Sequence, residues 1–462
     1  MKGDGNLEQV KYAFSFVRKV IQICERAENK QKYQFVVYNA SIKTWHIVRG
    51  LMRPGWSKYL VEILEEISRL LEDDSDFNWQ CRYLNALCKA LADAEKKPES
   101  LKVLDKLAEV TKRKGDCSFQ ETLFRTRVHL YRDNNGMLAN IKKETETGDD
   151  PHGYKALFVI QQIRSGVIPE PQIEKELQLL LSQIAPASVS DDPAAAAQSQ
   201  KTTPIMQDRI AECGRMAVKH GLIAYAEGAC FAVARARQGS LRAKVLTEYT
   251  KAELLLKKPS AEVDPKTGMK LNTIQRQLED FERRVEALKI LDRAMIANRR
   301  LQDADVTIEG CVLIWNIGIP LLKNSARGHI YKPFQAAATA LELLEANESQ
   351  LRVCLHLELA KFEIEQDFLS RASLQLKKAL TIDYSAVQKN LQVELTEEDN
   401  PDDFARPYDR ALKFLLKKLD LKTNLYGGDP DSMHELIILD VENGKTTKNA
   451  KMRQTLLGKA LR

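Results

Sequence analysis

Apolar residues recur at helical spacing along almost the whole chain, and almost no stretch alternates as a half-buried β-strand would. The clearest stripe lies in residues 57–71 and consists of Leu60, Ile63, Leu64, Ile67, Leu70 and Leu71. Positions i, i+3, i+4 and i+7 lie on one face of an α-helix, so this stripe predicts a helix that buries one side. Ser57 is suited to begin this helix, and Pro54-Gly55 is suited to end the preceding one. This periodicity restricts the chain to an all-α fold.

The predicted helices follow one another in pairs joined by short turns, which favours antiparallel hairpins. The first clear pair covers residues 31–52 and 57–71. Further helices are predicted at 77–94, 98–114, 173–184, 208–219, 222–237, 241–256, 271–300, 306–322, 333–344, 351–366, 368–381 and 407–422. The best candidate for a strand, residues 435–441, is too short to decide.

Small residues at a fixed spacing indicate the type of hairpin, because a large side chain where two helices cross would hold their backbones apart. The tetratricopeptide (TPR) pattern places one small residue in the first helix, a second 12 residues later and a third 7 beyond that. Ala360, Ala372 and Ala379 have this spacing. A weaker copy, whose last member is not small, is formed by Gly214, Ala226 and Val233. The other hairpins lack the spacing, so we expect an all-α, irregular TPR-like solenoid of antiparallel helical hairpins.

Composition predicts four segments. Residues 185–204 are rich in Ala, Ser, Gln, Asp and Pro and lack large apolar residues, which is typical of a disordered linker. Residues 257–270 and 396–407 contain prolines and are predicted to be loops, the second of them acidic. We therefore expect an N-terminal helical-hairpin array at 1–184, the linker at 185–204, a TPR-like helical array at 205–395, and an acidic loop, basic helix and tail at 396–462.

The charge of the chain argues against a nucleic-acid partner. Lys and Arg number 70 against 64 Asp and Glu, a net charge of 70 − 64 = +6, which is small for 462 residues. A nucleic-acid-binding protein would be expected to carry a basic stripe interleaved with aromatics, or a readout motif, and neither is found. The positive excess is local, since residues 406–462 carry 12 basic and 7 acidic side chains.

The cysteines indicate neither a zinc site nor a disulfide framework. None of the eight forms a CxxC pair, and most lie among apolar residues in helical patterns, so we expect buried, reduced thiols in a cytosolic protein. They are Cys24, Cys81, Cys88, Cys117, Cys213, Cys230, Cys311 and Cys354. Residues 1–9 do not resemble a signal peptide, and no apolar run approaches the ~20 residues of a membrane helix. We expect a soluble, intracellular protein with no membrane partner.

The sequence contains no recognisable catalytic or cofactor-binding motif. Phosphate-binding GxxxxGK[ST], GxGxxG after a strand, GxSxG and HExxH are all absent. The histidines are isolated, and none has an acidic or Cys neighbour at metal-ligand spacing; they are His46, His129, His152, His220, His329, His356 and His434. Carboxylate clusters at 72–74 and 397–399 fall in predicted turns, where water would solvate them. We therefore predict no catalytic residue, no cofactor and no metal, and a protein that is not an enzyme.

Two basic amphipathic stretches have two possible interpretations. Residues 11–27 and 410–422 each combine apolar positions at helical spacing with several lysines or arginines. Such stretches are typical of calmodulin targets or partner helices, but also of ordinary array helices with a solvated basic face, which is the preferred interpretation of both. The second stretch begins the basic tail, where positive charge would steer the chain toward an acidic partner such as the microtubule lattice.

Two groups of residues carry a family resemblance. The first is Val37-Tyr38-Asn39-Ala40-Ser41, Trp45, Val48, Arg49 and Pro54-Gly55. The second is Arg284-Val285-Glu286, Leu291-Asp292-Arg293-Ala294, Trp315-Asn316, Pro320-Leu321-Leu322 and Lys332-Pro333. Together they resemble the N-terminal region of the cilia- and flagella-associated protein forty-six family, tetratricopeptide proteins of the ciliary central apparatus. The resemblance runs, with gaps, from about residue 31 to about residue 384.

The resemblance implies a structural role in the motile cilium. Such proteins help to build the C1d projection of the central apparatus with other cilia- and flagella-associated proteins, and that projection, with calmodulin among its components, takes part in controlling ciliary beating. It implies localisation to the axoneme and no enzymatic activity. Family members are much longer, so the chain is expected to be a fragment or a short relative.

No binding residue is transferred from the family. Tyr38, Asn39 and Trp45 are interpreted as hairpin packing, with Asn39 bonding a neighbouring backbone group from within an apolar helix. The alternatives are a TPR-like adaptor subunit of another cytosolic complex and an enzyme of unrecognised type. An enzyme would require a buried, convergent set of titratable residues, which the sequence does not show.

Overall fold

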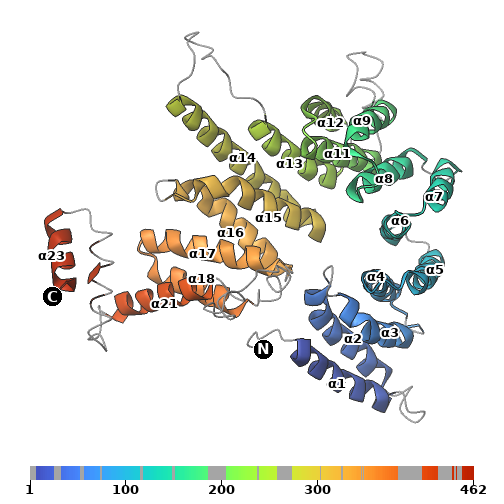
Figure 1. Cartoon of the computed structure of the whole chain (residues 1–462), viewed down its shortest axis with the longest axis horizontal. Coiled ribbons are helices and arrows are strands. Elements are labelled where there is room, and N and C mark those ends of the chain that lie inside the picture. The colour runs from blue at the N-terminus through green and yellow to red at the C-terminus, as the bar shows by residue number, and fades with distance from the viewer. Residues whose placement is uncertain are drawn as a thin grey trace, which may run out of the picture. The chain divides into compact units, whose positions relative to one another are not determined.

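The computed structural model of the chain is shown in Figure 1. It describes residues 7–24, 33–52, 57–72, 75–114, 118–147, 151–185, 204–236, 239–257, 273–301, 303–323, 326–344, 346, 348–382, 408–424, 437, 440, 441, 444 and 450–461. Of these residues 88% are helical, in 19 α-helices, and none forms a strand. The predicted all-α fold is confirmed. The three described residues of the candidate strand at 435–441, namely Ile437, Asp440 and Val441, are helical.

The chain divides into two compact units, which we call the N-terminal and C-terminal units. The N-terminal unit is Asn6–Arg276, and the C-terminal unit is Gln277–Arg462 together with Met1–Gly5. This division falls inside the long helix α14 (Thr273–Leu301). It follows contact density, whereas the four segments predicted above follow composition, so those segments stay a prediction. Residues 186–203 of the predicted linker, and nearly all of both predicted loops, lie outside the described residues.

The N-terminal unit contains twelve of the α-helices and two short 3₁₀ helices. They are α1 (Leu7–Cys24), α2 (Gln34–Val48), η1 (Arg49–Leu51), η2 (Ser57–Leu60), α3 (Val61–Leu70), α4 (Phe77–Asp93), α5 (Lys97–Lys114), α6 (Ser118–Leu130), α7 (Asn135–Thr147), α8 (Pro151–Arg164), α9 (Glu170–Ile184), α11 (Pro204–Lys219), α12 (Ile223–Arg235) and α13 (Leu241–Lys257). The apolar stripe predicted from Leu60 to Leu71 is buried except for Leu70, which is partly buried; Leu60, Leu64 and Ile67 are inaccessible to solvent.

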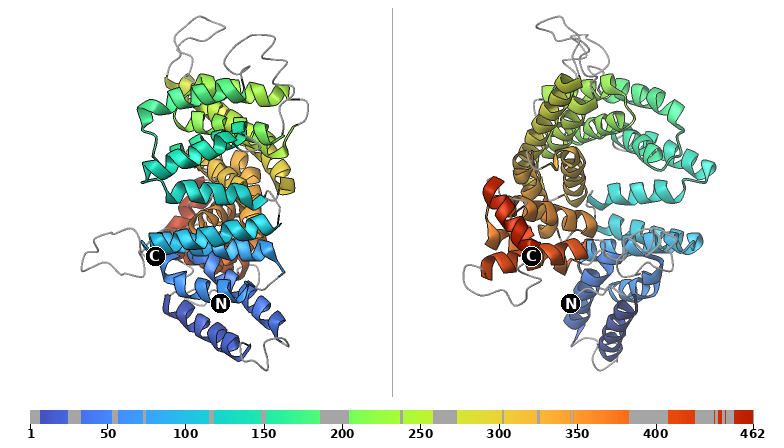
Figure 2. Two further views of the ribbon diagram at one scale, coloured as in Figure 1. Left: turned by 90° about the vertical axis from the view of Figure 1, so that its right-hand side faces the viewer. Right: turned by 60° about the vertical axis from the view of Figure 1, so that its left-hand side comes forward.

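The C-terminal unit continues the same architecture. It contains α15 (Ala304–Gly318), η4 (Ile319–Leu321), α16 (Arg327–Leu343), α17 (Ser349–Glu365), α18 (Leu369–Thr381), α21 (Asp409–Asn424) and α23 (Ala450–Ala460), besides most of α14. Consecutive helices from α15 to α18 pack against one another, and α21 packs on α18 (Figures 1 and 2). Ala360, Ala372 and Ala379 are completely buried between α17, α18 and α21. The small residues thus lie where the sequence pattern expected two helices to approach closely.

The partial match at residues 214–233 also lies at a helix crossing. A Cβ atom added to Gly214 of α11 would lie 3.0 Å from the Cβ of Ala229 of α12. Ala226 is completely buried and Val233 is almost so. Glycine therefore allows α11 and α12 to approach closely, as the pattern predicted.

Several hairpins end their first helix with the same backbone turn. In α4–α5, α8–α9, α11–α12 and α17–α18, one residue adopts positive φ: Glu95, Gly166, Gly221 and Asp367. The next amide donates back to a carbonyl five residues earlier, as in Lys96 N to Leu91 O at 2.9 Å and Phe368 N to Glu363 O at 2.8 Å. This is the Schellman arrangement, which satisfies carbonyls that a helix end leaves open. We call these four the Schellman turns.

Three helices between residues 118 and 164 were not predicted individually. Helix α8 shows why: Ala156, Leu157, Phe158, Val159 and Ile160 are five consecutive buried residues. A helix surrounded by α6, α7, α9 and α11 buries all its sides, so its apolar residues form no single stripe.

The segment Ala304–Leu321 is apolar enough to resemble a membrane-spanning helix. By length and mean hydropathy it could cross a bilayer, but half of it is buried, as in a core helix.

Candidate functional site

The described residues contain no cluster of three or more His, Cys, Asp or Glu side chains placed to hold a metal ion. The predicted absence of catalytic, cofactor-binding and metal-binding residues stays a prediction. All seven cysteines in the described part of the chain are buried. Burial raises the pKa of the Cys230 and Cys311 thiols to about 12, which suppresses the reactive thiolate.

The histidine of the best TPR-like hairpin lies in a packed interface. His356 of α17 is 1% exposed. Its Nδ1 lies 2.7 Å from Gln375 Oε1 of α18, and its Nε2 lies 3.1 Å from Glu342 Oε1 of α16. Burial lowers the pKa of His356 despite its contacts with Gln375 and Glu342. The residue therefore bridges three helices of the array.

The first group of resemblance residues lies in an aromatic cluster between α2 and α4. The ring centroid of Trp45 lies 5.6 Å from that of Trp79 and 5.3 Å from that of Tyr83, while Tyr38 lies 6.4 Å from Trp79. Such centroid separations are typical of favourable edge-to-face and tilted aromatic pairs. Two aromatic residues of α2 thus pack against two of α4, which is the packing role expected for Tyr38 and Trp45.

Polar groups fix the aromatic cluster in one register. Tyr38 donates its hydroxyl proton to Asp76 Oδ2 at 2.8 Å, and Asp76 also caps α4 by accepting from the Trp79 amide. Tyr83 donates to the carbonyl oxygen of Ser41 at 2.7 Å, and Trp79 Nε1 donates to Ser41 Oγ at the same distance. Burial raises the pKa of Tyr83.

Asn39 differs from its expected role. It is exposed, so it does not lie among apolar residues as the sequence suggested. The buried polar side chains of α2 are Ser41 and Thr44, which donate to the carbonyls of Tyr38 and Ala40 respectively.

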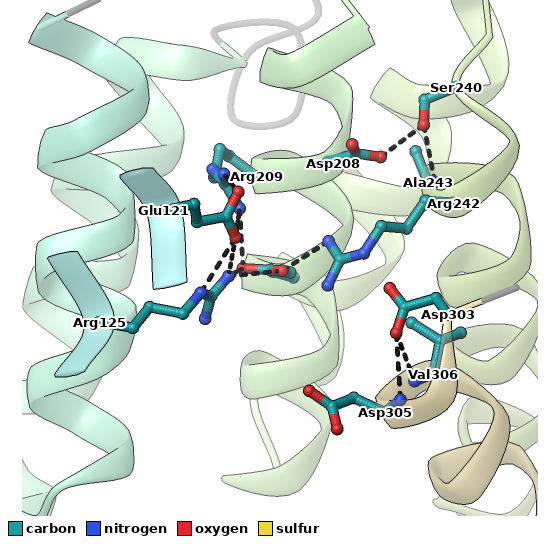
Figure 3. A network of polar contacts seen from close by, with 11 residues as sticks. Glu121, Arg125, Asp208, Arg209, Ser240, Arg242, Ala243, Asp303, Asp305 and Val306 are labelled. Atoms are coloured by element: carbon teal, nitrogen blue, oxygen red, sulfur yellow. Dashed lines mark hydrogen bonds and ion pairs between the residues drawn. The ribbon is translucent and has the colours of Figure 1, made fainter. Parts of the chain in front are cut away.

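A second buried polar centre joins α6, α11 and α13 in the N-terminal unit (Figure 3). We call it the ion-pair cluster; its members are Glu121, Arg125, Arg209, Glu212 and Arg242. The Glu212 carboxylate accepts from Arg125 at 3.0 Å and from Arg242 at 2.6 Å, and lies 3.4 Å from Arg209. Arg209 also donates to Glu121 Oε2 at 2.5 Å. Glu212 and Arg209 have side chains 2% and 6% exposed.

The electrostatics of the ion-pair cluster depend on three positive neighbours of one carboxylate. Burial opposes ionisation of Glu212, but the guanidinium groups of Arg125, Arg242 and Arg209 lower its pKa to about 2. Glu121 has a lowered pKa for the same reason, since Arg209 and Arg125 outweigh its burial. The cluster therefore stays fully charged at neutral pH. It is suited to holding three helices together, and its charges all face one another.

The two basic amphipathic stretches differ in what they leave exposed. In α21, Leu412 and Leu419 are buried against α17 and α18, so the array already occupies the apolar face of residues 410–422. This supports the interpretation of 410–422 as an array helix. In α1, Phe14 and Ile21 are buried in the core with α2 and α3, whereas Tyr12 and Phe16 are exposed. Residues 11–27 thus contain both a packed apolar face and an open one.

No protein-family model matches the chain. The chain is similar to cilia- and flagella-associated protein 46 of Chlamydomonas reinhardtii, with 24% identity over 503 aligned positions. The alignment covers 99% of this chain and 16% of the relative, so the chain spans about a sixth of that protein's length. The resemblance inferred from residues 33–55 and 284–333 is confirmed, and the alignment extends beyond the predicted limits of about 31 and about 384.

Proposed function

We propose that this chain is a structural scaffold segment of the motile-cilium axoneme that binds other proteins through the surfaces of its helical arrays. The single observation that carries the proposal is the alignment with cilia- and flagella-associated protein 46, which covers 99% of the chain. The fold supports it, because stacked helical hairpins offer extended surfaces for protein partners. The finer proposal is a place in the C1d projection of the central apparatus, among other cilia- and flagella-associated proteins.

The exposed and buried side chains of α21 bear on two proposed partners, microtubules and calmodulin. Lys413 and Lys417 are exposed on this helix, so we propose that they steer the chain toward an acidic surface such as the microtubule lattice. Calmodulin would need the apolar face of α21, and Leu412 and Leu419 are buried there. Direct calmodulin binding by residues 410–422 would therefore require α21 to leave its core.

The test is localisation of the tagged chain in cells with motile cilia. We expect it in isolated axonemes, and we expect it to be lost from axonemes of mutants that lack the central pair. A matched pair of variants separates scaffold integrity from non-specific retention. Trp45→Ala removes a side chain of the aromatic cluster and should reduce incorporation, whereas Lys97→Ala removes only an exposed ion pair and should not. Recovery of the chain with cytosolic complexes and not with axonemes would refute the proposal in favour of an adaptor role.

A further inference from the structure

Helix α1 carries a second apolar face, which the described residues of the N-terminal unit leave exposed. Tyr12, Phe16 and Val20 are 67%, 50% and 38% exposed. Their spacing places all three on one side of the helix, over roughly 12 Å at 1.5 Å per residue. The Tyr12 and Phe16 rings touch edge to face, with centroids 4.9 Å apart. We call these three residues the α1 stripe.

The α1 stripe differs from isolated exposed apolar residues on other helices. Phe231 of α12, for example, is 49% exposed, but its ring is covered on one side by Arg235 at 4.2 Å. Isolated exposed apolar residues are normal on protein surfaces, whereas a contiguous row is typical of a binding site. The row also has the geometry of a ridge that packs between the side chains of another helix.

The opposite face of α1 shows that this helix can pack with helices on either side. Phe14 and Ile21 are buried in the core that α1 shares with α2 and α3. Arg18 donates to Glu66 Oε2 at 2.9 Å and to Glu62 Oε2 at 3.0 Å, and both glutamates belong to α3. The contact between α1 and α3 is therefore an apolar stripe on one helix bordered by ion pairs, with the basic residue on α1 and the acidic residues on its partner.

The charges beside the α1 stripe select the kind of partner. Residues 12–24 contain Arg18 and Lys19 and no acidic residue. Lys19 lies at the stripe, with its Nζ 5.6 Å from the centre of the Phe16 ring. Two copies of this surface would bring Lys19 against Lys19, which disfavours self-association. A helix that presents apolar residues flanked by Asp or Glu would be complementary.

We propose that the α1 stripe docks an amphipathic α-helix of another protein whose apolar face is flanked by acidic residues. The proposal rests on the scaffold function above and names one of its binding surfaces. The partner helix lies alongside α1 and does not surround it, because α2 and α3 occupy the other side. A membrane surface fits less well, since Lys19 is the one exposed basic side chain among residues 12–24 and supplies little attraction to anionic lipid.

The test is site-specific photo-crosslinking in ciliated cells, with the full chain carrying a photoreactive phenylalanine analogue at position 16 or, as the matched control, at position 231. Both native phenylalanines are about half exposed. We expect crosslinks at position 16, several-fold more than at 231, to peptides with helical apolar spacing and flanking Asp or Glu. In a chain that also carries Lys19→Glu, the yield at position 16 should fall several-fold, while the unfolding midpoint stays unchanged.

Three results would overturn the inference: equal yields at the two positions, crosslinks chiefly to a second copy of this chain, or crosslinks chiefly to lipid. Localisation of the same tagged chains separates this inference from the proposed function. Chains present in axonemes without a position-16 product would refute the α1 stripe alone. Chains absent from axonemes would refute the axonemal scaffold, whatever position 16 contacts.

Discussion

Replacing Glu212 by alanine should strongly destabilise the N-terminal unit. The substitution removes the one carboxylate that faces Arg125, Arg209 and Arg242 together, and leaves three guanidinium groups close to one another. Breaking a buried ion pair by removing one partner costs about 3–5 kcal/mol, because the remaining charge stays buried. Glu144→Ala is the matched control, since this glutamate pairs with Arg127 but is 55% exposed. Exposed pairs contribute about 0–1 kcal/mol.

The lowered pKa of Glu212 gives a second value for the free energy that this carboxylate contributes to folding. Its pKa falls from an ordinary value of 4.5 to about 2 in the folded protein. A difference of 4.5 − 2 pKa units, at 1.36 kcal/mol each, corresponds to about 3 kcal/mol. Because the folded pKa is the lower one, this stabilisation is complete above about pH 5. It is lost as the pH falls from 4.5 through 2, since the unfolded chain then binds a proton that the folded chain does not.

The measurement is amide hydrogen exchange of α11 as a function of urea, because it reports the opening free energy of this unit separately from the other. We expect α11 to open more readily by about 3 kcal/mol in Glu212→Ala at pH 7, and the difference from the wild type to shrink as the pH approaches 3. Equal opening free energies for Glu212→Ala and Glu144→Ala would refute the reasoning, as would a difference that does not depend on pH.

Three further predictions concern packing and turns. Tyr83→Phe should lower the unfolding free energy, measured by urea titration, by about 1 kcal/mol, because the buried Ser41 carbonyl loses its hydrogen-bond donor. The control Tyr59→Phe, at a half-exposed tyrosine, should change this free energy by less than about 0.5 kcal/mol. Gly318→Ala should destabilise by about 1–3 kcal/mol in thermal unfolding, since the new Cβ would lie 2.5 Å from an atom of the buried Phe334 ring. Gly328→Ala should be neutral or stabilising, because the new Cβ would lie 4.0 Å from the Phe362 ring, and the reverse order of the two effects would contradict the packing. Asp367→Gly should raise the unfolding midpoint and the unfolding free energy, the latter by about 0.5–1 kcal/mol, because glycine adopts the φ of 58° found at position 367 without strain. A loss of stability would show that the Asp367 side chain contributes to the turn.

The fold was predictable from the sequence because helical periodicity is a local property. The stripe from Leu60 to Leu71 and the small residues at 360, 372 and 379 identify helices and one crossing without any knowledge of distant contacts. Helix α8 was not predicted from the sequence because it is buried on all sides and shows no single apolar face. The turns at Glu95 and Asp367 were not predicted because glutamate rarely adopts positive φ, and aspartate, although enriched there, occurs in many other conformations.

The buried centres were harder to predict than the helices. Trp45 stood out in the sequence, but its partners Trp79 and Tyr83 lie on another helix, and nothing local connects them. The ion-pair cluster joins Glu121 to Arg209 across 88 positions of the chain. Charged residues at such separations look like ordinary solvated positions until the fold brings them together.

The Schellman turns bear on how far a chain of this kind can diverge while keeping its architecture. Each turn is closed by amide and carbonyl groups that belong to the backbone, as between Lys96 and Leu91 or between Phe368 and Glu363. Every residue except proline supplies these groups, and Glu, Gly and Asp all occur at the positive-φ position. Mutation can therefore replace most side chains of a hairpin without breaking the hydrogen bonds of its Schellman turn. Identity as low as the 24% found here is compatible with an unchanged succession of hairpins, and new contact surfaces can evolve on the helices while the corners stay the same.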